Sequence, residues 1–407
     1  MTAGPADVLI AGAGPAGSAT AIHLARAGLR VVMVDRAAFP RDKACAEYMS
    51  PDTLRLLASL GVLPQLDGAG GHLLPGLRVT APYGSDLLGL FARAGCAPFR
   101  PVGLSLPRRL LDTTLVDVAR ACGVDVRERA AVEELLYDEG AVAGAVIRSR
   151  SGRSALRARV TIGADGLRSR VARRMGGCRT GVPRRIAFSA HVRGVEGIGP
   201  GDPAEMHVGR RGYVGINPLG DGLANVAVVV SASRAREAAG NAAGFFLREL
   251  ESYPDVRGRV PHDGIARRVL ATGPFASRAT RVTAAGALLV GDAADFFDPF
   301  TGEGIWSALR GAELAARTLV PALVAEPGIL PAWRIAGYRA ARRRAFAGKW
   351  LVERLIGYAM WSPRLFDRAV ERLGRRPGMA HTLVGVTGRF VPARRVLDPR
   401  FLARMVF

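Results

Sequence analysis

The chain has 407 residues, 49% of them hydrophobic, and a formal net charge of +22. This length is sufficient for two or three domains with sizeable cores, or for one large domain with an insertion. No stretch approaches about 18 uninterrupted apolar residues, which argues against a membrane-spanning helix.

The positive charge does not by itself indicate nucleic-acid binding. Only Lys43 and Lys349 are lysines, so nearly all of the charge comes from arginines spread along the chain, with no basic block interleaved with aromatic residues. We therefore expect no nucleic-acid partner, while weak attraction to anionic lipid stays open. The first motif begins within a dozen residues of Met1, which leaves no room for a targeting peptide and predicts a cytoplasmic protein. Peripheral contact with the inner face of the membrane is an open alternative.

The cysteines and histidines do not predict a metal site. The four cysteines show no C-x-x-C or zinc-type spacing, and no H-E-x-x-H motif or carboxylate cluster is present. We expect no metal.

A glycine-rich turn between a short apolar strand and an alanine-rich helix is the first motif. The strand covers residues 8–11 and the helix 18–27, and Gly12, Gly14 and Gly17 between them have G-x-G-x-x-G spacing. Such glycines allow the tight turn, the approach of a pyrophosphate and close packing of helix on strand. The helix N-terminus then offers free N–H groups to the phosphates.

A second strand at 30–34 ends at Asp35, whose position suits a hydrogen bond to a ribose hydroxyl. Strand, turn, helix, strand and acid together predict a dinucleotide site rather than an unrelated glycine turn. The predicted cofactor contacts here are Gly12, Gly14, Pro15, Ala16, Gly17, Asp35 and Arg36.

The next segment, 39–51, carries Cys45, Glu47 and Ser50-Pro51, with a Leu60-Gly61 pair further on. It resembles a loop of the geranylgeranyl reductase branch of the p-hydroxybenzoate hydroxylase superfamily of FAD enzymes, although Ala46 replaces the usual glycine. The resemblance implies that the loop passes close to the flavin ring. Cys45 would then contact FAD and either orient substrate or shuttle a proton, the alternative being a small buried hydrophobic residue.

Three further segments match the same family. A helix opens at Arg108, which by its spacing would reach toward the FAD phosphates rather than only start a solvated helix. Residues 160–171 contain a Gly-Ala-Asp-Gly turn whose Asp165 would bind FAD. Residues 287–309 resemble the flavin-edge segment, with the helix N-terminus facing the flavin ring and Asp292 on a ribityl hydroxyl. The cofactor residues implied there are Gly291, Asp292, Pro299, Gly302, Gly304 and Ile305.

Residues 181–270 have a different pattern. Strand-like stretches at 186–192, 204–208, 212–216 and 223–230, followed by a helix at 242–250, indicate an antiparallel sheet. In the resembled family this sheet covers the flavin and forms the substrate cavity. Here Gly215 stands where the family has a tryptophan, so the cavity has more room or a different shape. The predicted substrate contacts are Tyr213, Asn217, Pro218, Phe297 and Phe300.

Candidates for proton transfer are Cys45, Tyr213 and His191. Histidine titrates near neutrality, so His191 or His207 could act as a base, although a lone histidine on a strand is commonly structural.

The predicted fold is α/β, with a Rossmann-type, glutathione reductase-like FAD-binding domain, an inserted antiparallel substrate sheet and a helical tail. We assign 1–75, 101–180 and 271–330 to the FAD domain, 76–100 and 181–270 to the substrate sheet, and 331–407 to the helical region. Residues 123–132 are predicted as a strand, and 141–149 with 154–160 as a hairpin. In the tail an apolar face at 350–360 predicts a lid packed on the protein; the alternative is an interfacial helix.

These features predict an FAD-dependent, NAD(P)H-driven oxidoreductase acting on a hydrophobic or aromatic small molecule. The sequence favours a monooxygenase of secondary metabolism that uses O2 to hydroxylate a phenol or alkyl-tailed polyketide. The alternative is reduction of isoprenoid double bonds, as in the resembled branch. Halogenation fits poorly because the Trp-x-Trp-x-Ile-Pro segment is missing, and a redox-silent binding protein conflicts with the intact flavin-edge segment at 299–305. The sequence leaves the oligomeric state open.

Overall fold

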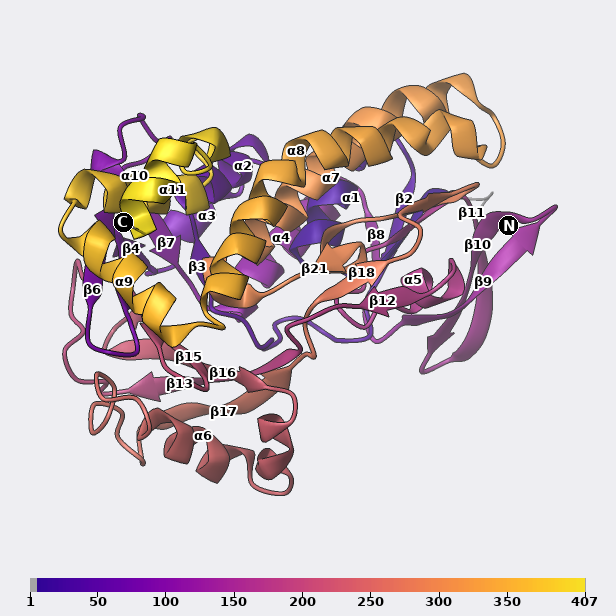
Figure 1. Cartoon of the computed structure of the whole chain (residues 1–407). Helices are drawn as coiled ribbons and strands as arrows, with labels where there is room; N and C mark the ends of the chain where they lie inside the picture. The colour runs from indigo at the N-terminus through magenta and orange to yellow at the C-terminus, as the bar shows by residue number, and fades with distance from the viewer. Residues whose placement is uncertain (1–5, 407) are drawn as a thin grey trace.

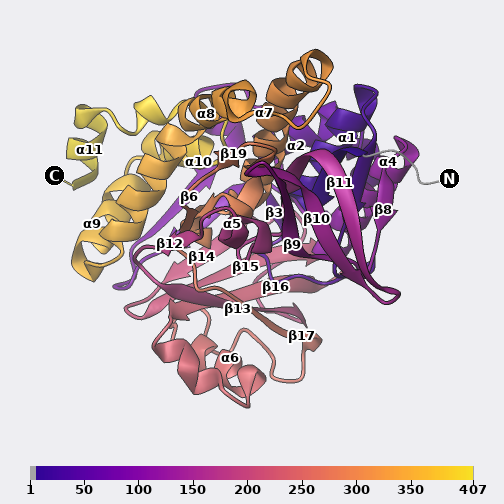
Figure 2. The same ribbon diagram turned by 90° about the vertical axis from the view of Figure 1, so that its right-hand side faces the viewer.

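A computed structural model describes residues 6–406 and contains two large sheets, with helices around them (Figures 1 and 2). The first sheet has the order β19-β20-β11-β1-β2-β8, and β20, β11, β1, β2 and β8 run parallel. Its strands are β1 (Ala6–Ala11), β2 (Val31–Val34), β8 (Asp125–Arg127), β11 (Gly152–Gly163), β19 (Thr283–Ala284) and β20 (Ala287–Leu289). Residues 8–11 of β1 and 160–163 of β11, where the two strands pair in parallel, are buried on both faces, as expected of parallel strands.

Helices α1 (Pro15–Arg26), α4 (Arg108–Ala121) and α7 (Gly304–Ala325) pack together beside this sheet. The first helix begins three residues earlier than predicted, because Pro15 has the fixed φ that suits a first helical turn. Strand β10 (Ala141–Ser149) pairs antiparallel with the first half of β11, which confirms the predicted hairpin. On its other side β10 pairs antiparallel with β9 (Ala131–Asp138). The predicted strand at 123–132 is confirmed only over Asp125–Arg127 (β8); Arg129 has φ of 52°, and a separate strand, β9, begins at Ala131.

The second sheet has the order β17-β13-β16-β15-β14-β5-β6. It contains the predicted antiparallel strands. The predicted helix α6 (Ala242–Leu250) packs on the face of this sheet that is turned away from the first sheet (Figure 1). The strands are β5 (Gly76–Thr80), β6 (Asp86–Leu90), β13 (Arg185–Arg193), β14 (Ala204–Val208), β15 (Gly212–Gly220), β16 (Leu223–Ser231) and β17 (Ile265–Thr272). In the register of β13, β15 and β16, His191 pairs with Asn225, and Asn225 with Asn217. These three side chains therefore share one face.

Short elements connect the two sheets. They are β3 (Tyr48–Met49), α2 (Pro51–Ser59), α3 (Leu63–Asp67), β4 (His72–Leu74), β7 (Gly103–Ser105), α5 (Arg170–Arg174), β12 (Cys178–Thr180), β18 (Ser277–Ala279) and β21 (Asp295–Phe296). Strands β3, β7 and β4 form one small sheet, and β12, β18 and β21 form another.

The end of the chain is helical, with α8 (Ala332–Ala359), α9 (Pro363–Gly374), α10 (Pro377–Thr387) and α11 (Pro399–Val406). Helix α8 runs beside α7, and α9 and α10 pack on β6 (Figure 1). The mixed α/β fold with a parallel sheet and a helical C-terminal region is confirmed. The domain boundaries given above stay a prediction.

Candidate active site

The G-x-G-x-x-G turn leads directly from β1 into α1. A Cβ added at Gly17 would lie 1.8 Å from the carbonyl oxygen of Gly12, and Gly12 itself has φ of 102°. Only glycine allows this approach of helix to turn. The methyl group of Ala16 packs closely on Gly291, in the segment after β20, because a Cβ added at Gly291 would lie 2.8 Å from it. The turn therefore places the N–H groups of α1 at the edge of the sheet.

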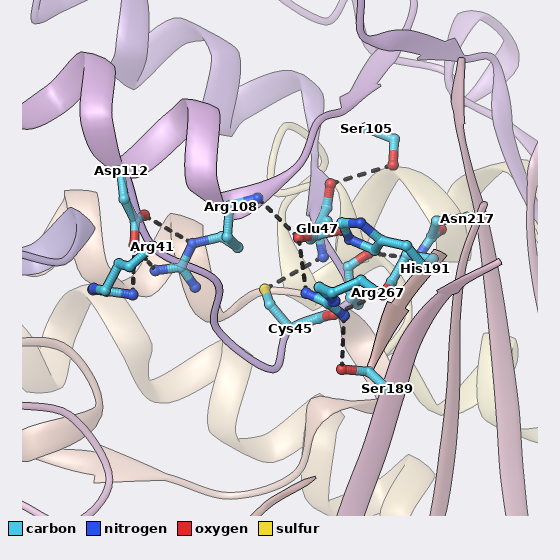
Figure 3. Close-up of polar contacts among 12 residues, drawn as sticks. Arg41, Cys45, Glu47, Ser105, Arg108, Asp112, Ser189, His191, Asn217 and Arg267 are labelled. Carbon is cyan, nitrogen blue, oxygen red and sulfur yellow. Dashed lines mark hydrogen bonds and ion pairs between the residues drawn. The ribbon is translucent and has the colours of Figure 1, made fainter. Parts of the chain in front are cut away.

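Two arginines face this N-terminus. A Cβ at Gly14 would lie 3.6 Å from Arg41 Nη2 and 4.0 Å from Arg108 Nη2. Arg108 donates two 2.8 Å hydrogen bonds to the fully buried carboxylate of Asp112, and Arg41 lies 3.1 Å from the same carboxylate (Figure 3). Asp112 holds both guanidinium groups in place, and the trio keeps a net positive charge suited to a diphosphate.

Arg108, predicted to reach the FAD phosphates, thus lies beside the N-terminus of α1, and so does Arg41, which was not predicted as a site residue. The signal was present in the run Phe39-Pro40-Arg41, which follows the acidic end of β2.

Asp35 ends β2 with both carboxylate oxygens engaged. They accept hydrogen bonds of 2.8 Å from the backbone N–H groups of Ala13 and Ala37. Each oxygen retains a lone pair, which fits a ribose hydroxyl. The side chain of Arg36 is exposed beside this site.

Asp165 has a buried oxygen without a partner. Its Oδ2 accepts the backbone N–H of Arg170 at 2.6 Å, whereas Oδ1 makes no hydrogen bond to any described residue. Burial raises the pKa of this carboxyl above its usual value, partly offset by hydrogen bonds from the turn. A buried carboxyl oxygen without a partner, such as Asp165 Oδ1, fits a hydrogen bond to a polar group of a bound cofactor.

Lys43 lies beside this turn. Its Nζ would lie 3.7 Å from a Cβ at Gly166. Burial lowers the pKa of Lys43, and Arg108 lowers it further. Burial raises the pKa of Asp292, an effect that the charges of Lys43 and Arg108 oppose. Lys43 is a second cation that the sequence analysis missed.

The segment before α7 forms a second helix N-terminus, whose flanking residues are largely buried. Asp298 Oδ1 accepts the N–H of Phe300 at 3.0 Å, and Pro299 follows in a short turn that ends at Gly302 with φ of 68°. A Cβ at Gly302 would lie 2.6 Å from the ring of Tyr48. The 22-residue helix α7 then begins at Gly304, with Ile305 buried behind it. Its positive end suits the electron-rich edge of a reduced flavin.

The Cys45 loop is held against the second sheet by hydrogen bonds. Asn225 donates to the carbonyl of Cys45 at 3.0 Å, and Asn217 donates to that of Ala46 at 2.8 Å. The amide of Asn217, predicted to contact substrate, therefore positions the loop, and Pro218 is buried beside it. Cys45 is half-buried, and its Sγ accepts the backbone N–H of Glu47 at 3.3 Å.

Glu47 forms the centre of a buried polar cluster that the sequence analysis did not predict as a site (Figure 3). It is 1% exposed; its Oε2 lies 2.6 Å from His191 Nε2, and its Oε1 accepts the backbone N–H of Arg108 at 2.8 Å. Arg267 Nη1 lies 3.7 Å from Oε1 and makes no hydrogen bond to a described residue. The cluster therefore links the sheet that carries His191 to the helix that carries Arg108.

Tyr213 forms a separate buried cluster. Its hydroxyl donates a 2.6 Å hydrogen bond to Asp298, which Arg185 contacts at 2.8 Å. Burial and the charge of Asp298 raise the pKa of Tyr213 well above its usual value, so the phenol stays protonated. Phe300 packs on the Tyr213 ring at 5.2 Å. Tyr213 thus holds the flavin-edge segment against β15.

Phe297 and His207 lie in different surroundings. The ring of Phe297 is half-buried and packs on Tyr358 of α8 at 6.4 Å. His207 lies 2.8 Å from Glu205 and 3.0 Å from the Thr80 hydroxyl, so both of its ring nitrogens have partners. Of the two strand histidines, only His191 contacts the Cys45 loop.

Two further properties concern the whole described chain. Residues 6–406 contain no group of three or more His, Cys, Asp or Glu side chains arranged to hold a metal ion. Within the same residues, no helix has the length and apolar character needed to cross a membrane.

Comparison with known proteins agrees with this geometry. A family model described as FAD binding domain matches residues 5–347. Digeranylgeranylglycerophospholipid reductase 1 of Methanococcoides burtonii is 31% identical over 79% of this chain and 76% of its own. Menaquinone reductase of Mycolicibacterium smegmatis is 33% identical over 84% of each chain.

Among solved structures, the myxobacterial chondrochloren halogenase has a TM-score of 0.79 at 24% identity, covering 99% of this chain and 94% of its own. A geranylgeranyl bacteriochlorophyll reductase-like protein from Thermoplasma acidophilum has a TM-score of 0.77 at 22% identity, covering 98% and 97%. At these identities the structures show a shared fold. The family match and the relatives together establish that the chain belongs to the FAD-binding-domain family of flavin-dependent oxidoreductases, in its geranylgeranyl reductase branch.

Proposed function

We propose that this enzyme is an FAD-dependent reductase that saturates carbon–carbon double bonds of a hydrophobic isoprenoid compound, with NAD(P)H as the electron donor. The structural observation that carries the proposal is the Cys45 loop, held against the sheet with the buried Glu47–His191 pair behind it. The names of the two relatives support it, since geranylgeranyl lipids and menaquinone are isoprenoid compounds.

The residues described above fit FAD along its length. Arg41, Arg108 and the N-terminus of α1 would hold the diphosphate, and Asp35 the adenosine ribose. Asp165 and Asp292 would hold the polar groups between diphosphate and flavin ring, and the N-terminus of α7 would lie at the ring edge.

When bound and reduced, FAD supplies a hydride to one carbon of a double bond. The protein then has to deliver a proton to the other carbon. The thiol of Cys45 is the proposed donor, because its loop is fixed and its Sγ is oriented by the N–H of Glu47. Glu47, two residues after Cys45, and His191 of β13 lie 2.6 Å apart and form a hydrogen-bonded pair that would share a proton behind the loop. The product would gain two hydrogens for each bond reduced, the Cys45 thiolate would regain a proton from water, and NAD(P)H would supply the hydride and, with it, the two electrons.

An anaerobic turnover experiment tests the proposal. Purified protein, NAD(P)H and a detergent-dispersed geranylgeranyl lipid should yield a product heavier by two hydrogens per reduced bond, in deuterium-labelled water with one solvent deuteron per bond. Absence of saturated product, together with consumption of NAD(P)H only in air, would contradict it.

Hydroxylation, which the sequence favoured, has no support from the relatives named above. It is the second candidate because of the space around Gly215. The nearest neighbours of a Cβ added at Gly215, where the family has a tryptophan, would be Met206 and the carbonyl of Glu205 at 3.8–3.9 Å, so a β-carbon fits here without a clash. An aromatic guest could use this room. Labelled oxygen from O2 in the product of a phenolic substrate would establish hydroxylation instead.

A further inference from the structure

Helix α8 has two apolar faces, only one of which packs on the protein. Ile335, Tyr338, Phe346 and Val352 are buried against the core. Of the predicted apolar face, Trp350, Ile356, Ala359 and Met360 also pack on the protein, as a lid would. Leu351 and Leu355 of that face are exposed instead.

The exposed apolar residues continue into the next helix. Thirteen large hydrophobic residues are exposed within the described chain, and five of them fall between residues 351 and 365. These five, each between 40% and 58% exposed, are Leu351, Leu355, Tyr358, Trp361 and Leu365. We call them the α8–α9 patch. Single exposed hydrophobic residues are ordinary, but a cluster of this kind marks an interaction surface.

The charges around the patch are positive. Arg339, Arg343, Arg344 and Arg354 are exposed on α8, and none of them has a salt bridge to a described residue. The single acidic residue of α8, Glu353, is buried and paired with Lys349. On α9, Asp367 accepts a hydrogen bond from Ser85 and Glu371 pairs with Arg375. Leucine and tryptophan flanked by arginine is the composition of a helix that lies in an anionic lipid surface.

The patch leads inward to the flavin-edge segment. The rings of Trp361 and Tyr358 are 5.1 Å apart, and Tyr358 packs on Phe297 at 6.4 Å. Phe297 directly precedes Asp298, the partner of Tyr213. A line of packed aromatic rings therefore runs from the exposed Trp361 to the flavin-edge segment.

We propose that the α8–α9 patch docks the enzyme on an anionic lipid surface and that an isoprenoid chain enters the site beside Tyr358 and Phe297. The docking depends only on the exposed residues, whereas the entry of an isoprenoid chain rests on the proposed function. The alternative partner for the patch is a second copy of this chain. In a symmetric dimer through this face, the arginines of the two α8 helices would meet without an exposed carboxylate on α8 to pair with them.

The test uses the full FAD-loaded chain with vesicles of phosphatidylcholine alone or mixed with phosphatidylglycerol. Because a protein of net charge +22 adsorbs to anionic vesicles in many orientations, the decisive measurement is insertion of the patch. Brominated acyl chains should quench tryptophan fluorescence in the wild type, and most of this quenching should be lost in Trp361→Phe. The double variant Leu355→Ser/Trp361→Ser should bind about tenfold or more weakly.

The matched control is Tyr137→Ser/Val182→Ser, which removes two comparably exposed residues outside the patch and should bind like the wild type. Equal binding by patch and control variants, or quenching unchanged in Trp361→Phe, would overturn the docking. So would a wild-type dimer that the patch variant converts to a monomer. Reduction of detergent-dispersed substrate is measured in parallel, so that loss of docking with retained activity is distinguished from failure of the proposed reaction.

Discussion

Glu47 Oε2 lies 2.6 Å from His191 Nε2, and Glu47 adopts a left-handed backbone conformation with φ of 62°. A left-handed backbone conformation costs a non-glycine residue on the order of 1 kcal/mol or more, and it persists only where the surrounding structure enforces it. Here the backbone of Arg108 and the side chain of Ser105 both bind Glu47. The fold thus accepts backbone strain in order to aim a buried carboxylate at a histidine.

We expect Glu47→Gln to lower kcat by about tenfold to a hundredfold, because the amide cannot share a proton with His191. The matched control is Glu205→Gln, which breaks another glutamate–histidine contact on the same sheet, 2.8 Å between Glu205 and His207. Both variants should lose stability by about 1–3 kcal/mol, measured by chemical unfolding. Only Glu47→Gln should alter the pH profile of kcat; an equal change in both would assign Glu47 a purely structural role.

Cys45→Ala should reduce turnover by about a hundredfold or more if the thiol donates the proton to substrate. FAD content, measured from flavin absorbance, should stay near that of the wild type, since the loop is held mainly through the carbonyls of Cys45 and Ala46. Cys122→Ala, another half-buried cysteine, should leave turnover unchanged. Full activity in Cys45→Ala would remove the thiol from the mechanism.

Arg41→Ala should weaken FAD binding by about tenfold or more, because a charge-assisted hydrogen bond to phosphate contributes roughly 1.5–3 kcal/mol. The measurement is fluorescence titration of the apoprotein with FAD. The control is Arg109→Ala, at an exposed arginine next to Arg108, and this variant should bind FAD with unchanged affinity. Equal affinities in the two variants would place the diphosphate elsewhere.

Glu303 should make stability fall as the pH rises. Burial raises the pKa of this carboxyl to about 7, and the nearby charge of Glu353 contributes in the same direction. The folded state therefore binds more protons than the unfolded state between about pH 4.5 and 7, and the penalty of up to about 3 kcal/mol develops across that window. Relative to Glu303→Gln, the wild type should lose Tm steadily from pH 5 to 7.5. Parallel Tm curves for the two proteins would show that Glu303 does not titrate there.

The α/β fold, the glycine turn and the flavin-edge segment could be predicted from the sequence, because each is determined locally. Gly12, Gly14 and Gly17 satisfy steric requirements within a few residues of each other, and the 204–208 strand and the 242–250 helix follow from periodicity and capping. The short β8 could not be separated from β9 in this way, since the break between them includes a positive φ at Arg129 that residue type does not reveal.

The tertiary structure alone decided which side chains meet. Glu47 and His191 are 144 residues apart, and nothing in either neighbourhood marks the other as its partner. The same holds for Arg41 and Asp112, and for the two apolar faces of α8, of which one packs on the core while the other stays exposed. Local sequence determines the backbone, because sterics and periodicity act over short range. Burial and charge pairing depend on what the rest of the chain brings alongside, and these determined the site.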